Sequence, residues 1–521
     1  VDATVLGLTA SRQTRGHRFH YNQTLIIANA QDYLQKLPNI AYVQIDYQKR
    51  KELIRQQVIA EAEKINGHAV IDEDLLDEVT GLVEWPVALA GRFEDRFLEV
   101  PAEALIYSMK EHQKYFHVVD ANNQLMPHFI TVANIESTDP AQVIDGNERV
   151  IRPRLSDAAF FYETDKKVSL SEFRERLKPI VFQAQLGSIF DKTERIKALA
   201  SFIADQIGAD ISKVATASEL CKSDLISDMV GEFDKMQGLA GYYYAKHEGY
   251  DDEIALALKE HYMPKFAGDE LPSTTTGTIV AIADRLDTLT GIFGVGQKPT
   301  GSKDPFALRR ASLGTLRLLV DKNIDLDLHV LIDTAIQQHG SNIKNSAETA
   351  TTVFNYMVER FRAWYEEENI AAEVFQAVQA KQLSRPLDVY NRVHAVNAFS
   401  QLPQAAALAA ANKRVSNILN KLEGDVPVAL NNSLLQEPAE QELAKALAEK
   451  EKEVAPLFVD KDYSAVLAAL ADLRETIDNF FNNVMVMTED AALRNNRIAL
   501  LNQLRNLFLQ VADISLLVPV K

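Results

Sequence analysis

One stretch near the middle of the chain, residues 283–313, restricts the possible folds more than any other part of the sequence. Its first part carries apolar residues at helical spacing up to Phe293. Three glycines and a proline between positions 294 and 301 then end the helical pattern. Asp304 and Pro305 predict the start of a second helix, because an acidic cap followed by proline is typical of a helix N-terminus. The stretch therefore predicts two helices joined by a glycine-rich loop.

The loop and the second helix are basic although the chain is acidic. Residues 291–323 contain six Lys or Arg against two Asp, a local charge of +4, whereas the whole chain carries −18. Lys303, Arg309 and Arg310 belong to this basic group. They can lie on a solvated face of two packed helices, or they can meet the phosphates of RNA. Spacing alone leaves both alternatives open.

A nucleotide-binding loop is a third interpretation of this stretch, and the sequence argues against it. Gly296 and Gly301 have the outer spacing of a phosphate-binding loop. However, Ser302 and Lys303 follow in the reverse of the required Lys-Ser/Thr order. The preceding segment also has a helical pattern, where the motif requires a strand.

Composition indicates a globular protein of several domains. With 521 residues, the chain is long enough for about three or four domains of ordinary size. Its single cysteine, Cys221, excludes an internal disulfide and a cysteine-cluster zinc site, which fits a reducing cytoplasm. No apolar run approaches the roughly 18 residues that a membrane span requires. The acidity disfavours nucleic acid over much of the surface but allows it at local basic patches.

The chain changes character along its length, and four domains are expected. Strand-like runs such as Val5–Leu8, Ala41–Ile45 and Phe129–Val132 alternate with helices over residues 1–165, which predicts an α+β domain. The later periodicity is helical, so the predicted fold class is multidomain and mainly α. The other expected domains are a helical domain over residues 166–335, a helical connector over 336–404 and a helical bundle over 405–521.

Two polar clusters accompany the apolar stripes of the expected C-terminal bundle. In the first cluster, Lys413, Arg414 and Asn417 share one face of a helix. In the second cluster, Arg494 and Arg497 lie where the last helix is expected to begin. The ordinary interpretation of each cluster is a solvent-exposed helix face. Each cluster also has the residue types that contact RNA.

Several longer stretches point to a family. They are ADRLDTLTGIFGVG and GSKDPFALRRA within residues 283–311, VPAEALIYSMKEHQKYF at 100–116, GNERVIRPRLSDAAFFYETD at 146–165 and VMVMTEDAALRNNRIALL at 484–501. Together they closely resemble the beta subunit of bacterial glycyl-tRNA synthetase, the heterotetrameric enzyme with separate alpha and beta chains. The resemblance covers the whole chain. Because the sequence opens at Val1 without Met, an N-terminal portion of the family's chain is expected to be absent.

The resemblance implies a fold and a set of binding residues. Residues 1–165 would form a B3/B4-like module, residues 166–335 a degenerate HD-like domain, and residues 405–521 a DALR-type anticodon-binding bundle. Lys303, Arg309 and Arg310 then become candidate contacts to tRNA phosphates or to the acceptor arm. The candidate contacts on the anticodon side are Arg414, Asn417, Arg494 and Arg497.

The metal chemistry of the HD superfamily is not expected in this chain. Ser223 and Asp224 stand where the resemblance places the adjacent His-Asp pair, and Asp284 stands in the place of the last metal ligand. Only His261 remains as a possible relic, so the imidazole-rich ligand set is missing. A metal-dependent phosphohydrolase remains one alternative function, although the missing histidines count against it, and a helical scaffold that binds only protein is another.

No catalytic residue, metal or cofactor is expected in the chain itself. We find no class I or class II synthetase signature and no local Ser-His-Asp or Cys-His arrangement. The resemblance implies that the alpha subunit activates glycine with ATP and magnesium. It further implies that this chain, within a cytoplasmic alpha2 beta2 heterotetramer, binds glycine tRNA and presents its acceptor end to the alpha subunit.

Overall fold

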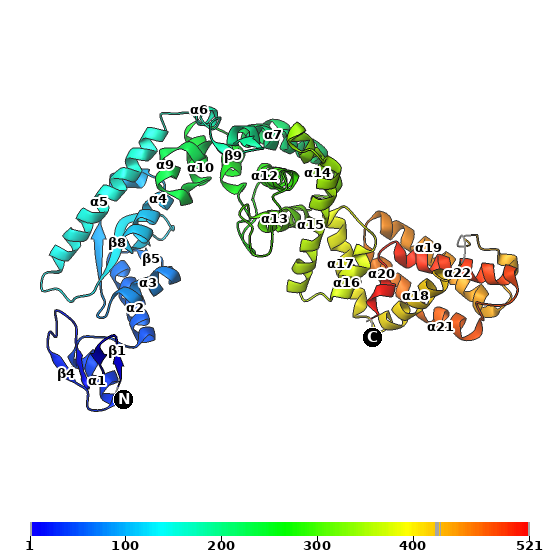
Figure 1. Cartoon of the computed structure of the whole chain (residues 1–521), viewed down its shortest axis with the longest axis horizontal. Helices are drawn as coiled ribbons and strands as arrows, with labels where there is room; N and C mark the ends of the chain where they lie inside the picture. Colours follow the sequence, from blue (N-terminus) through cyan, green and yellow to red (C-terminus); the bar gives the residue numbers. More distant parts are fainter. Residues whose placement is uncertain (1–2, 423–426, 428, 519–521) are drawn as a thin grey trace. The chain divides into compact units, whose positions relative to one another are not determined.

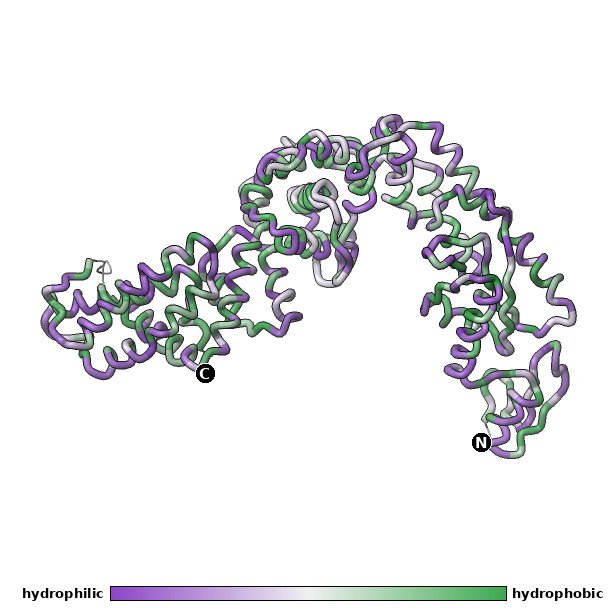
Figure 2. The backbone as a smooth tube through the Cα atoms, turned by 180° about the vertical axis from the view of Figure 1, so that it is seen from behind, coloured by the Kyte–Doolittle hydropathy of each residue, from purple (hydrophilic) through white to green (hydrophobic). Residues whose placement is uncertain are grey.

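The structure, a computed structural model, describes residues 3–422, 427 and 429–518 (Figure 1). Most of the described chain is helical, with short strands confined to its first two hundred residues. Hydrophilic and hydrophobic residues alternate along the helices (Figure 2). This alternation is expected for helices that bury one face and expose the other. The predicted mainly helical fold is confirmed.

The chain separates into two compact units. Residues 1–177 and 222–255 form the first unit, and residues 178–221 and 256–521 form the second. The first unit contains both strands and helices, whereas the second contains a single short β-hairpin besides its helices in the part of the chain that the structure describes.

Two small antiparallel ladders and one helix open the first unit. They consist of β1 (Thr4–Val5), β2 (Leu8–Thr9), β3 (Gln13–Arg15), β4 (Thr24–Ile26) and α1 (Ala30–Ile40). β1 pairs with β2, and β3 pairs with β4.

The prediction of two strands near the N-terminus is wrong. The segment Val5–Leu8 is the tip of the β1–β2 hairpin, where Leu6 and Gly7 have positive φ angles of 51° and 78°. The segment Ala41–Ile45 is irregular, because Tyr42 has a φ of 55° that no regular strand contains. Apolar composition alone could not reveal these two turns.

A four-stranded antiparallel sheet forms the core of the first unit. Its elements are α2 (Tyr47–Lys64), β5 (His68–Ala69), α3 (Glu73–Leu82), β6 (Val87–Arg92), β7 (Phe116–Val119) and β8 (Leu125–Ala133). The strand order is β5-β7-β8-β6. Ile54 and Val58 of α2 and Leu76 of α3 pack in one cluster with Phe116 and Ile130 of the sheet. The strand expected over residues 129–132 is confirmed as part of β8.

The remaining elements of the first unit are helical. They are η1 (Asp95–Glu99), α4 (Ala102–Tyr107), η2 (Ser108–His112), α5 (Pro140–Asp165), α6 (Leu170–Glu175), η3 (Ser223–Ile226), α9 (Asp228–Glu232), η4 (Asp234–Met236) and α10 (Leu239–His247). Tyr115 connects α5 to the sheet: its ring stacks on Phe129 at 4.6 Å between centroids, and its hydroxyl donates to Asn147 at 2.6 Å.

One central helix organises the first half of the second unit. The elements there are β9 (Val181–Gln183), β10 (Gly187–Ser188), α7 (Ile189–Ile207), α8 (Ile211–Leu220), the last part of α11 (Asp252–Glu260), which begins in the first unit, α12 (Thr275–Gly294), α13 (Leu308–Asp321), α14 (Leu328–Gln338), η5 (Gly340–Asn342) and α15 (Ser346–Glu367). α12 packs against α7, α8, α13, α14 and α15. Leu286, Leu289 and Ile292 are fully buried, as their spacing predicted.

The start of α13 differs from the prediction. We expected the helix to begin at Asp304 and Pro305, but it begins at Leu308, because Ala307 adopts a left-handed conformation with φ 53°. Asp304 nevertheless caps the helix from a distance. Its carboxylate accepts the backbone N–H groups of Leu308 at 2.8 Å and Arg309 at 2.9 Å.

The C-terminal half of the second unit is a helical bundle. Its elements are α16 (Ala372–Gln379), α17 (Pro386–Ser400), α18 (Ala405–Leu419), η6 (Asn432–Leu434), α19 (Pro438–Val459), α20 (Tyr463–Ala471), α21 (Arg474–Asn483), α22 (Ala491–Leu509) and η7 (Ile514–Leu517). α18 packs against α21 and α22, and α19 packs against α20, α21 and α22. Within the described residues, no helix combines the length and apolarity needed to cross a bilayer.

Candidate nucleic-acid interface

α18 has one face in the bundle core and a basic face on the opposite side. Leu408 and Val415 are buried and hold the helix against its neighbours. On the other side, Arg414 and Asn417 are exposed and Lys413 is half-buried. The spacing of three and four residues places these polar side chains next to one another on the helix surface.

A hollow of about 430 Å³ lies along this basic face. The guanidinium carbon of Arg414 lies 4.3 Å from the ring centroid of Phe481 on α21, a cation–π contact that holds the arginine across the surface. None of the described residues that line the hollow is an Asp or a Glu. Among the lining residues are Lys413, Arg414, Asn417, Lys421, Met487 and Val518.

The chemistry of this hollow suits an unstacked nucleotide. Lysine and arginine neutralise phosphate charge, and the face of a guanidinium or an aromatic ring can stack on a base. The side-chain amide of Asn417 offers both donors and an acceptor to a base edge. The arrangement can therefore hold a base and its phosphate together.

The two arginines of α22 have different surroundings. Arg494 is half-buried, and its Nη1 donates to the carbonyl of Thr488 at 3.1 Å. Arg497 is buried: its Nε pairs with the carboxylate of Glu440, and its Nη1 donates to the carbonyl of Met485 at 2.8 Å. The Arg497 guanidinium thus connects α22 to α19 inside the bundle. Arg494 is the member of this cluster that reaches the surface.

The basic group before α13 remains at the surface. Lys303 and Arg310 are exposed, and Arg309 is half-buried. The guanidinium of Arg309 donates to the carbonyl of Gly301 and so ties the loop to the helix. Thr300 and Lys303 exchange two backbone hydrogen bonds of 3.1 and 2.8 Å, which order the loop further. The loop therefore has a defined conformation that presents the ammonium of Lys303, and the first turn of α13 presents the guanidinium of Arg310.

Sequence reasoning missed three residues of the α18 site. Lys421 follows Lys413 and Asn417 at intervals of four residues, so helical periodicity could have identified it. Phe481 and Met487 come from α21 and from the loop after it. No local sequence signal places these two residues beside α18.

Comparison with known proteins identifies the family of this chain. The family model for the glycyl-tRNA synthetase beta subunit matches residues 1–380, and the family model for the DALR anticodon binding domain matches residues 408–515. The glycine–tRNA ligase beta subunit of Marinobacter nauticus is 57% identical over 519 residues. Those of Chromohalobacter salexigens and Pseudomonas aeruginosa are 55% and 54% identical over 515 and 517 residues. The chain belongs to the glycyl-tRNA synthetase beta subunit family.

Each of these alignments covers 99% of the chain and 75% of the relative. The chain is thus a subunit of glycine–tRNA ligase with a DALR anticodon-binding domain, as the resemblance implied. Of the residues that line the α18 hollow, all except Val518 lie within that domain. Family membership argues against the two alternative functions, a metal-dependent phosphohydrolase and a scaffold that binds only protein.

The residues that the resemblance placed at the HD metal ligands have other partners in the structure. Within the described residues, no group of three or more His, Cys, Asp or Glu could hold a metal ion. The buried carboxylate of Asp224 instead accepts the backbone N–H groups of Gly238 at 2.6 Å and Gly241 at 3.1 Å. His261 is fully buried, and its Nδ1 lies 2.9 Å from the carbonyl oxygen of Leu258.

Asp284, which the resemblance placed at the position of the last HD ligand, belongs to a buried ion cluster. The ammonium of Lys192 lies 2.8 Å from Asp284 Oδ1 and 2.9 Å from Asp287 Oδ2, and Arg195 Nε lies 2.6 Å from Asp287 Oδ1. Burial raises the pKa of Asp287, but Lys192 and Arg195 outweigh it and bring the pKa below its ordinary value. Side-chain cations thus already balance these carboxylates, and the residues present do not fit a metal ion.

Proposed function

We propose that the chain binds glycine tRNA and presents its acceptor end to an alpha subunit that carries the catalytic site. In this scheme the alpha subunit activates glycine with ATP and magnesium, and two copies of each chain assemble in the cytoplasm. The names of the relatives, beta subunits of glycine–tRNA ligase, support an alpha partner. In this proposal the alpha subunit carries out glycine activation, and the residues of this chain bind and position the tRNA.

The basic hollow on α18 is the observation that carries this proposal. Residues 400–521 contain twelve Lys or Arg against sixteen Asp or Glu, so bulk charge there repels RNA. Within this acidic region, the hollow gathers Lys413, Arg414 and Lys421 without a carboxylate among its described lining residues. Recognition of the anticodon side would therefore rest on a local patch and on hydrogen bonds from Asn417 to an unstacked base.

The other candidate residues take separate roles in the proposal. Arg494, at the surface of the same bundle, adds a further contact to the anticodon side of the tRNA. Arg497 holds α22 to α19 through its ion pair with Glu440. Lys303 and Arg310 contact phosphates of the acceptor arm. Arg309 holds the loop through Gly301 and has further N–H groups for a phosphate.

We also propose that the chain folds into four domains. Residues 1–165 would be the B3/B4-like domain, supported by a sheet with α2 and α3 packed on it. Residues 166–335 would be a degenerate HD-like domain, supported by the helices around α12 and the side-chain cations beside Asp284. The helical connector over residues 336–404 and the bundle over residues 405–521 complete the assignment.

Neutralising two cations of the hollow tests the proposal. We expect the double variant Lys413→Gln/Arg414→Gln to bind glycine tRNA roughly 10- to 100-fold more weakly, a total loss of about 1.4–2.7 kcal/mol, because two cations that meet the RNA are neutralised. Lys445→Gln, at an exposed lysine of α19, is the matched control and should bind like the wild type. Fluorescence anisotropy with labelled tRNA measures the affinity. Unchanged affinity of the double variant would remove the hollow from the tRNA site.

Glycylation assays with added alpha subunit give a second readout. Because these residues bind tRNA and do not touch the reacting atoms, the double variant should raise the KM for tRNA and leave kcat nearly unchanged. A fall in kcat at saturating tRNA, with KM unchanged, would contradict a binding role.

A further inference from the structure

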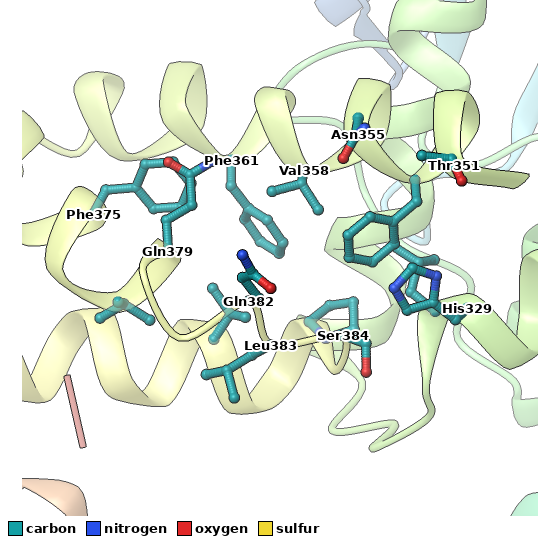
Figure 3. A pocket seen from close by; sticks show the side chains of 15 residues that line it. His329, Thr351, Asn355, Val358, Phe361, Phe375, Gln379, Gln382, Leu383 and Ser384 are labelled. Carbon is teal, nitrogen blue, oxygen red and sulfur yellow. The ribbon is translucent and has the colours of Figure 1, made fainter. Parts of the chain in front are cut away.

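A second cavity lies between α14, α15, α16 and α17 (Figure 3). Its volume of about 490 Å³ falls within the range of small-molecule binding sites. The cavity lies outside the residues assigned to tRNA binding above. Its walls come from these helices and from the loop that joins α16 to α17.

Aromatic rings form much of the wall. Phe361 on α15 and Phe375 on α16 are 1% and 4% exposed and form the interior. At the outer part of the cavity, the rings of His329 and Phe354 stack with centroids 3.8 Å apart and an interplanar angle of 17°. Figure 3 shows Phe361 and Val358 pointing from α15 into the cavity. The exposed ring of His329 and the half-buried ring of Phe354 therefore offer the flat surface that a ligand can reach, and Phe361 and Phe375 close the interior behind them.

Neutral polar groups surround these rings. Asn355, Gln379 and Gln382 are exposed and line the cavity with side-chain amides, each of which can donate and accept hydrogen bonds. Gln382 has a positive φ of 52°, in the loop that carries its side chain toward the centre of the cavity in Figure 3. Among the described residues that line the cavity there is no Lys, Arg, Asp or Glu.

This combination selects a flat, neutral ligand with polar edges. Without Lys or Arg in the wall, a phosphate or carboxylate would be buried at a cost in desolvation. A plain hydrocarbon would leave the amides facing an apolar surface. A planar heterocycle can stack on the pair formed by His329 and Phe354 and can pair its edge with the amides. We propose that this cavity is a binding site for one heterocyclic base of a nucleotide.

Two sources of such a base share this chemistry. One is an unstacked base of the bound tRNA, which rests on the function proposed above. The other is a free nucleoside or nucleotide, which does not depend on tRNA binding. In both cases the sugar and any phosphate would stay outside the wall, whose described lining residues include no Lys or Arg.

Nucleoside binding tests the site. Saturation-transfer difference NMR on the chain, with adenosine, guanosine, cytidine and uridine as probes, reports contact with each base. Val358→Trp fills the cavity, and Gln379→Leu removes an amide from its edge. Gln376→Leu changes an exposed glutamine of the same helix that does not line the cavity, and it is the matched control. We expect at least one nucleoside signal in the wild type and the control, reduced at least five-fold in both cavity variants.

Cross-linking separates the two sources. Glycine tRNA that carries photoreactive thionucleosides should cross-link to residues 329–389, and Val358→Trp should abolish these cross-links if the base comes from tRNA. Nucleoside signals without cross-links would assign the site to a free nucleotide. Absence of both, or signals that survive in both cavity variants, would overturn the proposal. The Lys413→Gln/Arg414→Gln variant should retain the nucleoside signals, because its substitutions lie outside the cavity. Loss of tRNA binding can therefore be told apart from loss of base binding in the cavity.

Discussion

Two arginines three positions apart on α22 differ because of their neighbours. Arg494 reaches only the carbonyl of Thr488 among the described residues. Arg497 meets Glu440, which is fully buried and which also accepts the backbone N–H of Gln436 at 2.8 Å. Each charge of the buried pair depends on the other, because an unpaired ion is costly in an apolar interior.

Replacing Arg497 should lower the stability of the bundle, and replacing Arg494 should weaken RNA binding. Arg497→Met should lower the free energy of unfolding of the bundle by roughly 3–5 kcal/mol, because Glu440 is left buried and unpaired. Arg494→Met should change it by less than about 1 kcal/mol and should weaken tRNA binding instead. Hydrogen exchange of α19 and α22 measures the first effect, and anisotropy with tRNA measures the second. Equal stability of the two variants would contradict this assignment.

Asp224 makes stability depend on pH. Its Oδ2 accepts two backbone N–H groups, but its Oδ1 has no hydrogen-bond partner in the described part of the chain. Burial raises the pKa of Asp224 to about 6, although the N–H groups of Gly238 and Gly241 oppose the shift. Between about pH 4 and pH 6 the folded chain therefore keeps a proton that the unfolded chain releases, so this carboxyl's stabilising contribution falls as pH rises.

Asp224→Asn should remove this slope. Relative to the wild type, the variant should gain stability as pH rises from about 4 to about 6, by about 3 kcal/mol over the interval, and then stay level. The asparagine oxygen can still accept from Gly238 and Gly241. Melting temperatures of both proteins across this pH range give the difference curve. A flat difference curve would show that Asp224 is ionised throughout.

At the scale of elements, long helices with a buried stripe were predictable, and short elements were not. The buried leucines of α12 indicated that helix through their spacing. The hairpin tip at Leu6 and the start of α13 at Leu308 depend on positive φ angles at non-glycine residues. Residue type does not signal such angles, because leucine and alanine rarely adopt them.

The left-handed residue before α13 gives a direct test. Ala307→Gly should stabilise the chain by up to about 1 kcal/mol, because glycine adopts a φ of 53° without the steric cost that alanine has. The matched substitution Ala311→Gly, inside α13, should destabilise it by about 1 kcal/mol. Hydrogen exchange of the α13 amides measures both. Destabilisation of similar size in both variants would contradict the strained start of α13.

At the scale of the whole molecule, sequence motifs identified the family more readily than they located its contacts. The match to the beta-subunit model confirms what long motifs such as residues 283–311 indicated. The partner of Arg497 and the ring under Arg414 come from segments far away in the sequence. Helical spacing shows which residues share a face, but it does not show what packs against that face. The burial of Arg497 was therefore not predictable.

The distribution of charge determines where this acidic chain can bind RNA. A chain with a net charge of −18 binds a polyanion only where cations gather without carboxylates. The α18 hollow meets this condition within the DALR domain, and Lys303 in the loop before α13 lies at the surface, as does Arg310 in the first turn of α13. We therefore expect tRNA binding that is specific but sensitive to salt.

The most direct test of tRNA binding is a salt series. The affinity of the chain alone for glycine tRNA and for an unrelated tRNA is measured by anisotropy at increasing salt. We expect tighter binding of glycine tRNA and a linear fall of log K with log salt. Lys413→Gln/Arg414→Gln should reduce the slope by about 0.7–0.9 for each phosphate that the variant no longer neutralises. Equal affinity for both tRNAs, or no binding of either at low salt, would contradict the claim that this chain recognises glycine tRNA.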